Sequence, residues 1–402
     1  MNARWEQAID ERVDRRFETM VAIRRHLHAY PEPSGAEHET TRYLNGVLVE
    51  LGLRTVPGPN GCGLIVDPAD LPRGPTIALR ADLDALRIDE QSAAQYASRQ
   101  PGLMHACGHD AHTAIVMGAI HALVDAAHEQ ALPWPVSWRG IFQPAEETLV
   151  GAQAMVGAGA LEGVSAILAV HVDPTRPIGR IGLRSGVLTA NCDGLSIRIL
   201  GRGGHAARPH ETKDPIATAA QLISTLYLFV PRSIDSQDAV VVSIGRIAGG
   251  QNANVIPESV ELGGTIRTLD RRVREQTQAH IRQLVRGLAE ASGTQIDVEF
   301  HAGIHSVRND TGLTELLRSV ASDLLGADAV DDIGRPSMGS EDFASYLDYV
   351  PGAMLRLGCT SSDHGGSALH TPTFDIDERA IGIGAKLLAR SAILWSDPRR
   401  LG

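Results

Sequence analysis

The sequence predicts an α/β protein in which a mostly parallel sheet, flanked by helices, is interrupted by a smaller inserted α+β domain. Short apolar runs without polar alternation alternate with helical segments through the first 186 residues, as in sheets that are buried on both faces. The pattern changes from residue 187, and alternating helix and strand signals return after residue 303. With 402 residues, the chain is long enough for two or three domains.

The first part of the chain begins with helical spacing of apolar residues over about thirty positions, which ends at Pro31 and Pro33. Residues 34–37, SGAE, predict a capping box for a second helix that runs toward residue 51. Apolar runs then predict strands at 63–66, 76–82, 136–143 and 166–172, with helices over 111–128 and 151–158.

The middle of the chain predicts a separate unit. It contains, in order, a strand at 194–201, a helix at 214–230, strands at 239–247 and 259–269, a helix at 271–292 and a strand at 294–302. This βαββαβ order is that of a ferredoxin-like sandwich. We therefore expect three segments: residues 1–186 and 304–402 form the larger domain, and 187–303 form an insertion. The final segment predicts a helix at 310–326, a strand at 353–358 and a helix at 377–395.

Composition excludes several classes of function. The net charge of −11 disfavours nucleic acid as a partner, because phosphates require a basic surface. No window approaches the roughly 20 apolar residues that span a bilayer, and the mixed charges of the first sixteen residues are unlike a secretory signal. The four cysteines are widely scattered, which favours reduced thiols and a cytoplasmic location over a disulfide framework.

Polar residues that can do chemistry follow the predicted strands of the larger domain. In an open α/β sheet the carboxyl ends of the strands form the ligand-binding edge. The polar residues expected there are Asp82, Asp84, Glu146, Glu147, His171 and His370, joined by Cys107 and His109 of the segment LMHACGHDAHT. Each motif alone has an ordinary explanation, such as a solvated turn or a core histidine, but five segments meeting at one edge predict a site.

Glu146 and Glu147 are adjacent carboxylates directly after an apolar strand. Such neighbours repel each other unless a cation lies nearby or they face different partners. One could bind a metal while the other acts as a general base on a water molecule. The alternative is a pair of exposed acids at the start of a helix, where the helix dipole favours them.

Cys107 and His109 allow two interpretations. A cysteine nucleophile needs a histidine base, but such partners usually come from distant parts of the chain, so the i, i+2 spacing weakly disfavours this interpretation. A thiolate and an imidazole can instead converge on a metal ion, with Gly108 permitting the tight backbone path. His105 and His112 are then expected to be loop or supporting residues. The candidate ligands number five, which suits two ions better than one tetrahedral ion: Cys107, His109, Glu147, His171 and His370.

Seven motifs carry a family resemblance: RADLDAL, MHACGHDAHT, QPAEE, GRGGHAARPH, GGQNANVIPE, GSEDFA and LHTPTFDIDE. In this order they resemble the amidohydrolase branch of the aminoacylase and carboxypeptidase-like zinc metallopeptidases, which includes hippurate hydrolases, N-acyl-amino-acid amidohydrolases and auxin-conjugate amidohydrolases. The resemblance covers nearly the whole chain. It implies a zinc-peptidase catalytic domain interrupted by a lid and dimerisation domain.

The resemblance also implies a dinuclear metal site in each subunit. Cys107 would bridge two divalent ions, and His109, Glu147, His171 and His370 would complete their coordination. Zinc or manganese is expected, and these ligand types also admit cobalt or nickel.

Further roles implied by the resemblance lie around the metals. Glu146 would deprotonate the bridging water and later protonate the leaving amine, and Asp84 would support the site from behind. His205 would reach into the partner subunit's site to stabilise the oxyanion. Asn254 and Arg267 would hold the substrate's carboxylate or line the pocket that the dimer completes, and an arginine suits bidentate carboxylate binding.

The predicted function is hydrolysis of N-acyl amino acids to a carboxylic acid and a free amino acid, by a homodimer that associates through the inserted domain. A metallo-dipeptidase or carboxypeptidase is the main alternative, although no clamp for a free α-amine is evident. A cysteine hydrolase and a non-catalytic binding protein are weaker alternatives, the latter because Glu146 and all five candidate ligands are present. The segments HVDPTRPIG and HAGIHSVRND depart from the family pattern and are expected to reshape the acyl pocket.

Overall fold

The computed structural model describes residues 4–72, 74–362 and 366–401. The chain divides into two compact units. Unit 1 contains the chain up to residue 186, Arg308–Gly334 and the chain from residue 342 onward. Unit 2 contains Val187–Val307 and Arg335–Glu341, and so includes the expected insertion together with residues 304–307 and a second short segment.

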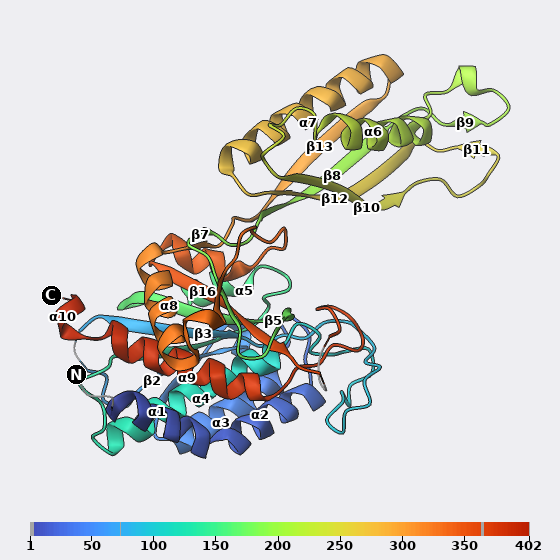
Figure 1. Cartoon of the computed structure of the whole chain (residues 1–402). Coiled ribbons are helices and arrows are strands. Elements are labelled where there is room, and N and C mark those ends of the chain that lie inside the picture. Colours follow the sequence, from blue (N-terminus) through green and yellow to red (C-terminus); the bar gives the residue numbers. More distant parts are fainter. Residues whose placement is uncertain (1–3, 73, 363–365, 402) are drawn as a thin grey trace. The chain divides into compact units, whose positions relative to one another are not determined.

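Unit 1 is built around a mixed sheet of eight strands among the described residues (Figure 1). Across the sheet the strands are β1 (Arg54–Pro57), β2 (Leu64–Asp67), β4 (Trp138–Gln143), β3 (Thr76–Asp82), β5 (Val164–Pro177), β16 (Gly352–Thr360), β6 (Ile181–Leu183) and β15 (Val330–Asp332). The central strands β4, β3, β5 and β16 are parallel to one another. Strand β3 is buried along its whole length, as its continuous apolar sequence predicts. The expected mostly parallel sheet is thus confirmed.

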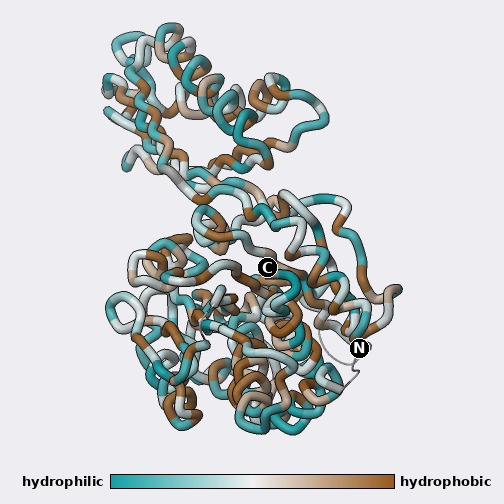
Figure 2. The backbone as a smooth tube through the Cα atoms, turned by 90° about the vertical axis from the view of Figure 1, so that its left-hand side faces the viewer, coloured by the Kyte–Doolittle hydropathy of each residue, from teal (hydrophilic) through white to brown (hydrophobic). Residues whose placement is uncertain are grey.

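Helices flank this sheet, and Figure 1 shows α1, α2, α4 and α9 gathered on one side of it. The helices of unit 1 are α1 (Arg4–Arg15), α2 (Phe17–Ala29), α3 (His38–Glu50), α4 (His109–His128), α5 (Gly151–Gly157), α8 (Thr311–Leu325), α9 (Arg379–Trp395) and α10 (Pro398–Leu401). Helices α2 and α4 approach closely at Gly118, where a Cβ would lie 1.9 Å from Sδ of Met20. In Figure 2 the apolar segments of unit 1 are concentrated toward its centre.

Two local expectations differ from the structure. The first thirty residues form two helices, because the chain breaks at Arg16 between α1 and α2. The expected capping box at residues 34–37 is wrong: α3 begins at His38 without a side-chain cap. The Glu37 carboxylate instead accepts hydrogen bonds from the backbone N–H groups of Gly35 and Ala145, and is therefore committed to tertiary structure.

Unit 2 has the expected βαββαβ order: β8 (Asn191–Leu200), α6 (Pro215–Phe229), β10 (Val240–Ala248), β12 (Ser259–Thr268), α7 (Arg271–Ser292) and β13 (Gln295–Ile304). The strands form an antiparallel sheet in the order β10-β12-β8-β13. Asp214 and Asp270 cap the two helices through backbone N–H groups of the first turn. A small ladder of β9 (Gly204–His205) and β11 (Val255–Ile256) lies at one end of the unit in Figure 1.

The remaining short elements are β7 (Gly186–Val187), β14 (Arg308–Asn309) and 3₁₀ turns at Pro59–Gly61, Pro209–Glu211, Ala327–Ala329 and Asp342–Asp348. Within the parts of the chain that the structure describes, none of the helices combines the length and the apolar character needed to cross a bilayer.

A buried ion-pair network ties the helical layer of unit 1 together. The Arg24 side chain is 1% exposed, and its Nε lies 2.8 Å from Oδ2 of the equally buried Asp110. Its remaining nitrogens reach Asp375 at 2.7 Å and Glu378 at 3.2 Å. Although burial disfavours the charged form of Asp110, the adjacent Arg24 and His28 hold the pKa of this carboxyl far below its usual range.

Replacing Arg24 with Met is therefore expected to lower the free energy of unfolding by about 3–5 kcal/mol, because Asp110 would remain buried without its main partner. Arg25→Met is the matched control. Arg25 contacts the same Glu378 but is half exposed, so its loss should cost less than about 1 kcal/mol. Urea unfolding at pH 7 measures the free energy of unfolding of both variants. Equally small losses for the two substitutions would contradict the proposed contribution of the buried network to stability.

Candidate metal centre

The predicted site residues of unit 1 meet at the carboxyl ends of β3, β4, β5 and β16. Cys107 lies in the loop before α4, and His109 is the first residue of that helix. Gly108 between them has a φ of +85°, and a Cβ there would lie 2.5 Å from Cγ2 of Val172. Glycine is therefore required at this position, because the backbone turns sharply against β5 to direct both neighbours into the site.

The side-chain atoms of the five candidate ligands form one cluster. Nε2 of His370 lies 3.3 Å from Sγ of Cys107 and 3.4 Å from Oε1 of Glu147. Nε2 of His171 lies 3.7 Å from the same sulfur. The ligand atoms of Cys107, His109 and Glu147 all lie within 4.8 Å of one another. Cys107 thus has two histidine neighbours from separate segments of the chain, His171 and His370. Glu147 and His109 lie close to the same sulfur.

Hydrogen bonds fix how the histidines face this cluster. Nδ1 of His109 lies 2.8 Å from the backbone oxygen of Asp84, and Nδ1 of His171 lies 2.7 Å from that of Val172. A carbonyl oxygen only accepts, so each Nδ1 carries a hydrogen and each Nε2 is directed to the cluster. Nε2 of His109 and Oε1 of Glu147 are buried without a hydrogen-bond partner among the described residues. A divalent cation would satisfy both atoms, and the Cys/His/Glu donor set fits such an ion.

The electrostatics of the cluster also favour a cation. Burial raises the pKa of the Cys107 thiol, so a thiolate there requires a positive charge nearby. Burial opposes a charged imidazole at His109, but the negative charge of Asp82 and the contacts with Cys107 and Asp84 together raise the pKa of His109. Burial, and then the positive charge of Arg356, lower the pKa of His171, which keeps that imidazole neutral. Without a metal, protons on Cys107 and His109 would occupy the place of the cation.

Metal binding is therefore expected to release protons, because both raised pKa values favour the protonated form in the metal-free protein. The apparent metal affinity should rise by about tenfold per pH unit for each proton released. Calorimetric titration with zinc in two buffers of different ionisation enthalpy measures the proton count. An affinity that is independent of pH between 6 and 8, with no proton release, would contradict this account of the cluster.

His112 is excluded as a ligand by its hydrogen bonds. Its Nε2 accepts from the backbone N–H of Val172 at 2.9 Å, so Nδ1 carries the hydrogen and donates to Asp82 at 2.7 Å. Asp82 also contacts Arg80 at 2.7 Å, and Arg80 reaches Asp342 at 3.1 Å. This series of buried contacts holds Asp82 close to His109, with Oδ2 of Asp82 at 3.8 Å from Nε2 of His109. His105 is buried elsewhere, beside His28.

Two carboxylates hold the loop that carries Glu146 and Glu147. Asp84 accepts hydrogen bonds from the Glu147 N–H at 2.9 Å and from the Ser34 hydroxyl at 2.6 Å. Glu37 accepts from the N–H of Ala145, whose φ of +55° is unusual for a residue with a side chain. Glu146 is buried, and its Oε2 lies 3.9 Å from Nε2 of His109. Sequence reasoning missed Glu37, because nothing local connects it with a loop 108 residues away.

The other predicted site residues belong to unit 2. His205 on β9 is exposed, and its Nδ1 accepts from the N–H of Ala207 at 3.1 Å. Asn254 lies beside it, since its backbone oxygen accepts from the N–H of Ala206 at 3.1 Å. Arg267 is half-buried near the opposite end of β12, where it donates to the backbone oxygen of Met338 at 2.9 Å. The end of β12 that lies near β9 and His205 is Ser259, which pairs with Leu200 of β8. At about 3.3 Å per strand residue, Arg267 lies roughly 25 Å from that end.

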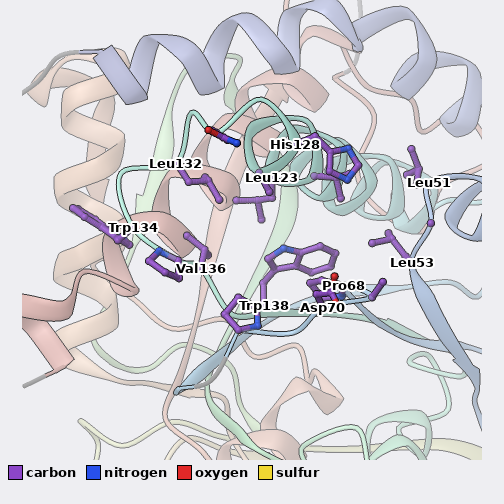
Figure 3. A pocket seen from close by; sticks show the side chains of 17 residues that line it. Leu51, Leu53, Pro68, Asp70, Leu123, His128, Leu132, Trp134, Val136 and Trp138 are labelled. Carbon is purple, nitrogen blue, oxygen red and sulfur yellow. The ribbon is translucent and has the colours of Figure 1, made fainter.

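A large apolar pocket lies far from the cluster. It has a volume of about 520 Å³ and is lined by side chains at the C-terminal end of α4 and the start of β4, including Leu123, Trp134 and Trp138 (Figure 3). The metal-ligand cluster surrounds the opposite, N-terminal end of α4, a helix of 20 residues or roughly 30 Å. The pocket therefore contributes nothing to the candidate centre.

Comparisons with known proteins give a consistent result. The model of "Peptidase family M20/M25/M40" matches residues 78–393. The chain is 39% identical to an N-acetyl-L-cysteine deacetylase of Bacillus subtilis, covering 93% of this chain and 87% of the relative. It is 36% identical to the IAA-amino acid hydrolase ILR1-like 4 of Arabidopsis thaliana, covering 94% and 85%. A crystal structure of a Bacillus subtilis dinuclear metal-binding peptidase of the M20 family is similar at a TM-score of 0.80 and 35% identity, covering 95% of this chain and 98% of that one.

Proposed function

Since this chain belongs to peptidase family M20/M25/M40 and is a metal-dependent amidohydrolase, we propose that it hydrolyses N-acyl amino acids to a carboxylic acid and a free amino acid. One observation carries this proposal. Five donor side chains of types that bind divalent metals converge in unit 1, and a sixth side chain, Glu146, lies beside them. A carboxylate that binds no metal ion but lies beside the ligands can act as the general base of a hydrolytic site.

The proposed cofactor is a pair of divalent ions in each subunit. The residues that would hold these ions are Cys107, His109, Glu147, His171 and His370, because their donor atoms gather around the sulfur of Cys107. Zinc or manganese is favoured, with cobalt or nickel also compatible with these donors. When bound, the ions would polarise the substrate's carbonyl group and lower the pKa of a water molecule. The exposed side chain of His370 marks the side open to substrate.

Glu146 would act as the general base and then as the general acid. Its buried carboxylate would take a proton from the attacking water and later deliver it to the departing nitrogen, so that the amine leaves in neutral form. Asp84 would act as a positioning residue, because it binds both the Glu147 N–H and the imidazole of His109. Asn254 and Arg267 would help to hold the substrate. The proposed location is the cytoplasm, which fits the four free cysteines.

Unit 2 supports a site shared between two subunits. His205 and Arg267 lie at opposite ends of this unit, roughly 25 Å apart, which is more than a single N-acyl amino acid spans. One substrate molecule can therefore meet both residues only if they come from different copies of the chain. We infer a homodimer in which His205 of one copy donates to the developing oxyanion in the site of the other.

A mixing experiment tests this arrangement. His205→Ala and Glu146→Ala proteins are each expected to lose most turnover while keeping both metals. Hybrid dimers should recover activity, because one of the two sites then combines an intact Glu146 with an intact His205, to at most about half of the hybrid's wild-type capacity. Subunit exchange is verified by native mass spectrometry of differently labelled proteins, and absence of recovery despite exchange would contradict a shared site.

A substrate panel tests the proposed reaction. Benzoyl-glycine and N-acetyl-methionine should be hydrolysed, whereas glycyl-methionine, which presents a free α-amine, should be hydrolysed at least about tenfold more slowly. A preference for the dipeptide would establish the metallo-dipeptidase alternative instead. Release of methionine, followed chromatographically, is the common readout for the two methionine substrates.

A further inference from the structure

Arg356 lies beside the candidate metal centre without an assigned role. It is on β16, where it pairs in register with His171 on the neighbouring parallel strand β5. Paired residues of adjacent strands place their side chains on the same face of a sheet, so Arg356 emerges directly next to a candidate ligand. On its other side Arg356 pairs with Gly182 of β6. Because Gly182 has no side chain, Arg176 fills the space beside it: the Arg176 Nε would lie 2.7 Å from a Cβ at position 182.

Arg356 differs from the neighbouring Arg176 in its carboxylate partners among the described residues. Arg176 is neutralised by Asp173 and Asp331, each at 3.0 Å. Arg356 is half-buried, and no carboxylate among the described residues lies within ion-pair distance of it. The four buried arginines among the described residues of unit 1 all have carboxylate partners, namely Arg12, Arg24, Arg80 and Arg390.

A partly desolvated guanidinium without an anion is unfavourable, and divalent cations nearby would make it more so. An anionic ligand would relieve this charge, and a guanidinium presents parallel donors that match a carboxylate. The neighbouring His171 places that anion next to the reacting centre.

We propose, on the basis of the amidohydrolase function above, that Arg356 binds a carboxylate of the substrate and sets the enzyme's selectivity for anionic amides. Two sources of this carboxylate are chemically equivalent at the arginine: the α-carboxylate of the amino-acid part, and a carboxylate at the end of the acyl part. Both place a negative charge a few bonds from the scissile amide.

The test compares substrates that differ only in charge. N-acetyl-methionine against N-acetyl-methioninamide probes the amino-acid side, and N-succinyl-methioninamide against N-butanoyl-methioninamide probes the acyl side. In the wild-type protein the charged member of one pair should have a kcat/KM about 10- to 100-fold higher than the neutral member. In Arg356→Met this advantage should fall to about threefold or less, mainly through KM, and the neutral substrate should keep its kcat. The pair that loses its advantage identifies the source of the carboxylate.

Binding provides a readout that does not depend on turnover. Calorimetric titration of the metal-loaded Glu146→Gln protein with each substrate should show the same charge preference, and Arg356→Met in that background should remove it. Arg318→Met changes an arginine of α8 that is paired with Asp332; it is the matched control and should change neither. The melting temperature of Arg356→Met should stay constant or rise, because the charge removed has no carboxylate partner among the described residues; a purely structural role predicts a fall.

The proposal is overturned if Arg356→Met keeps the wild-type preference, or if the wild-type protein shows no charge preference in either pair. A failure of the proposed function is separate from both. In that case no amide is hydrolysed by metal-loaded protein, while the binding preference and its dependence on Arg356 are still measured.

Discussion

Replacing Glu146 with Gln is expected to lower kcat by about 10²- to 10⁴-fold without changing the metal content of the protein. Glutamine keeps the size and the hydrogen-bonding oxygen of glutamate, but it cannot accept a proton from water at neutral pH. Because Glu146 lies beside the candidate ligands and is not one of the five proposed ligands, the loss should appear in kcat and leave metal binding intact.

Glu147→Gln is the matched control for this experiment. It changes the adjacent residue in the same chemical way, but Oε1 of Glu147 contacts His370 and faces His109. This variant should therefore lose metal, measured by elemental analysis after dialysis, together with activity. If Glu146→Gln lost metal to the same degree, Glu146 would be a ligand, and another group would have to serve as the base.

Replacing Cys107 with Ala is expected to weaken metal binding by more than about 100-fold and to abolish hydrolysis at ordinary metal concentrations. The sulfur is the common neighbour of two candidate ligands, so its removal disturbs both proposed ions. Loss of a group that merely supports a ligand already weakens metal binding by about 10- to 100-fold. Competition with a chromogenic chelator measures the affinity for zinc.

Cys359→Ala provides the comparison, because Cys359 is also a buried free thiol but lies in the core of unit 1. Its metal affinity and kcat should equal those of the wild-type protein. The cysteine-hydrolase alternative predicts a different result for Cys107→Ala, namely loss of activity with full retention of metal.

Much of the candidate centre could be predicted from strand ends. Apolar runs without alternation identified β3, β4, β5 and β16, and in a parallel sheet their carboxyl ends must lie together. This reasoning placed Asp84, Glu147 and His171 at one edge, and the structure brings these residues to that edge. The separate middle unit was predicted from the βαββαβ order of its elements, and in the structure this segment has a hydrophobic core of its own.

Contacts between distant residues were not predictable in this way. Glu37 has the spacing of a helix cap, yet its carboxylate binds Ala145 in a loop 108 residues away. Arg80 reads as part of an apolar strand, and only the fold brings it to Asp342, 262 residues further along. Arg356 likewise shows no signal in the sequence, because its position beside His171 follows from the register of β16 on β5. Such relations depend on tertiary structure, which local periodicity does not encode.

Removal and restoration of metal test the central claim most directly. The purified protein would be stripped with a chelator, shown by elemental analysis to be metal-free, and titrated with zinc, manganese or cobalt while hydrolysis of N-acetyl-methionine is followed. The two-metal account predicts that activity disappears with the metal and returns in full at two ions per subunit. Hydrolysis that persists in protein proven to be metal-free would contradict it.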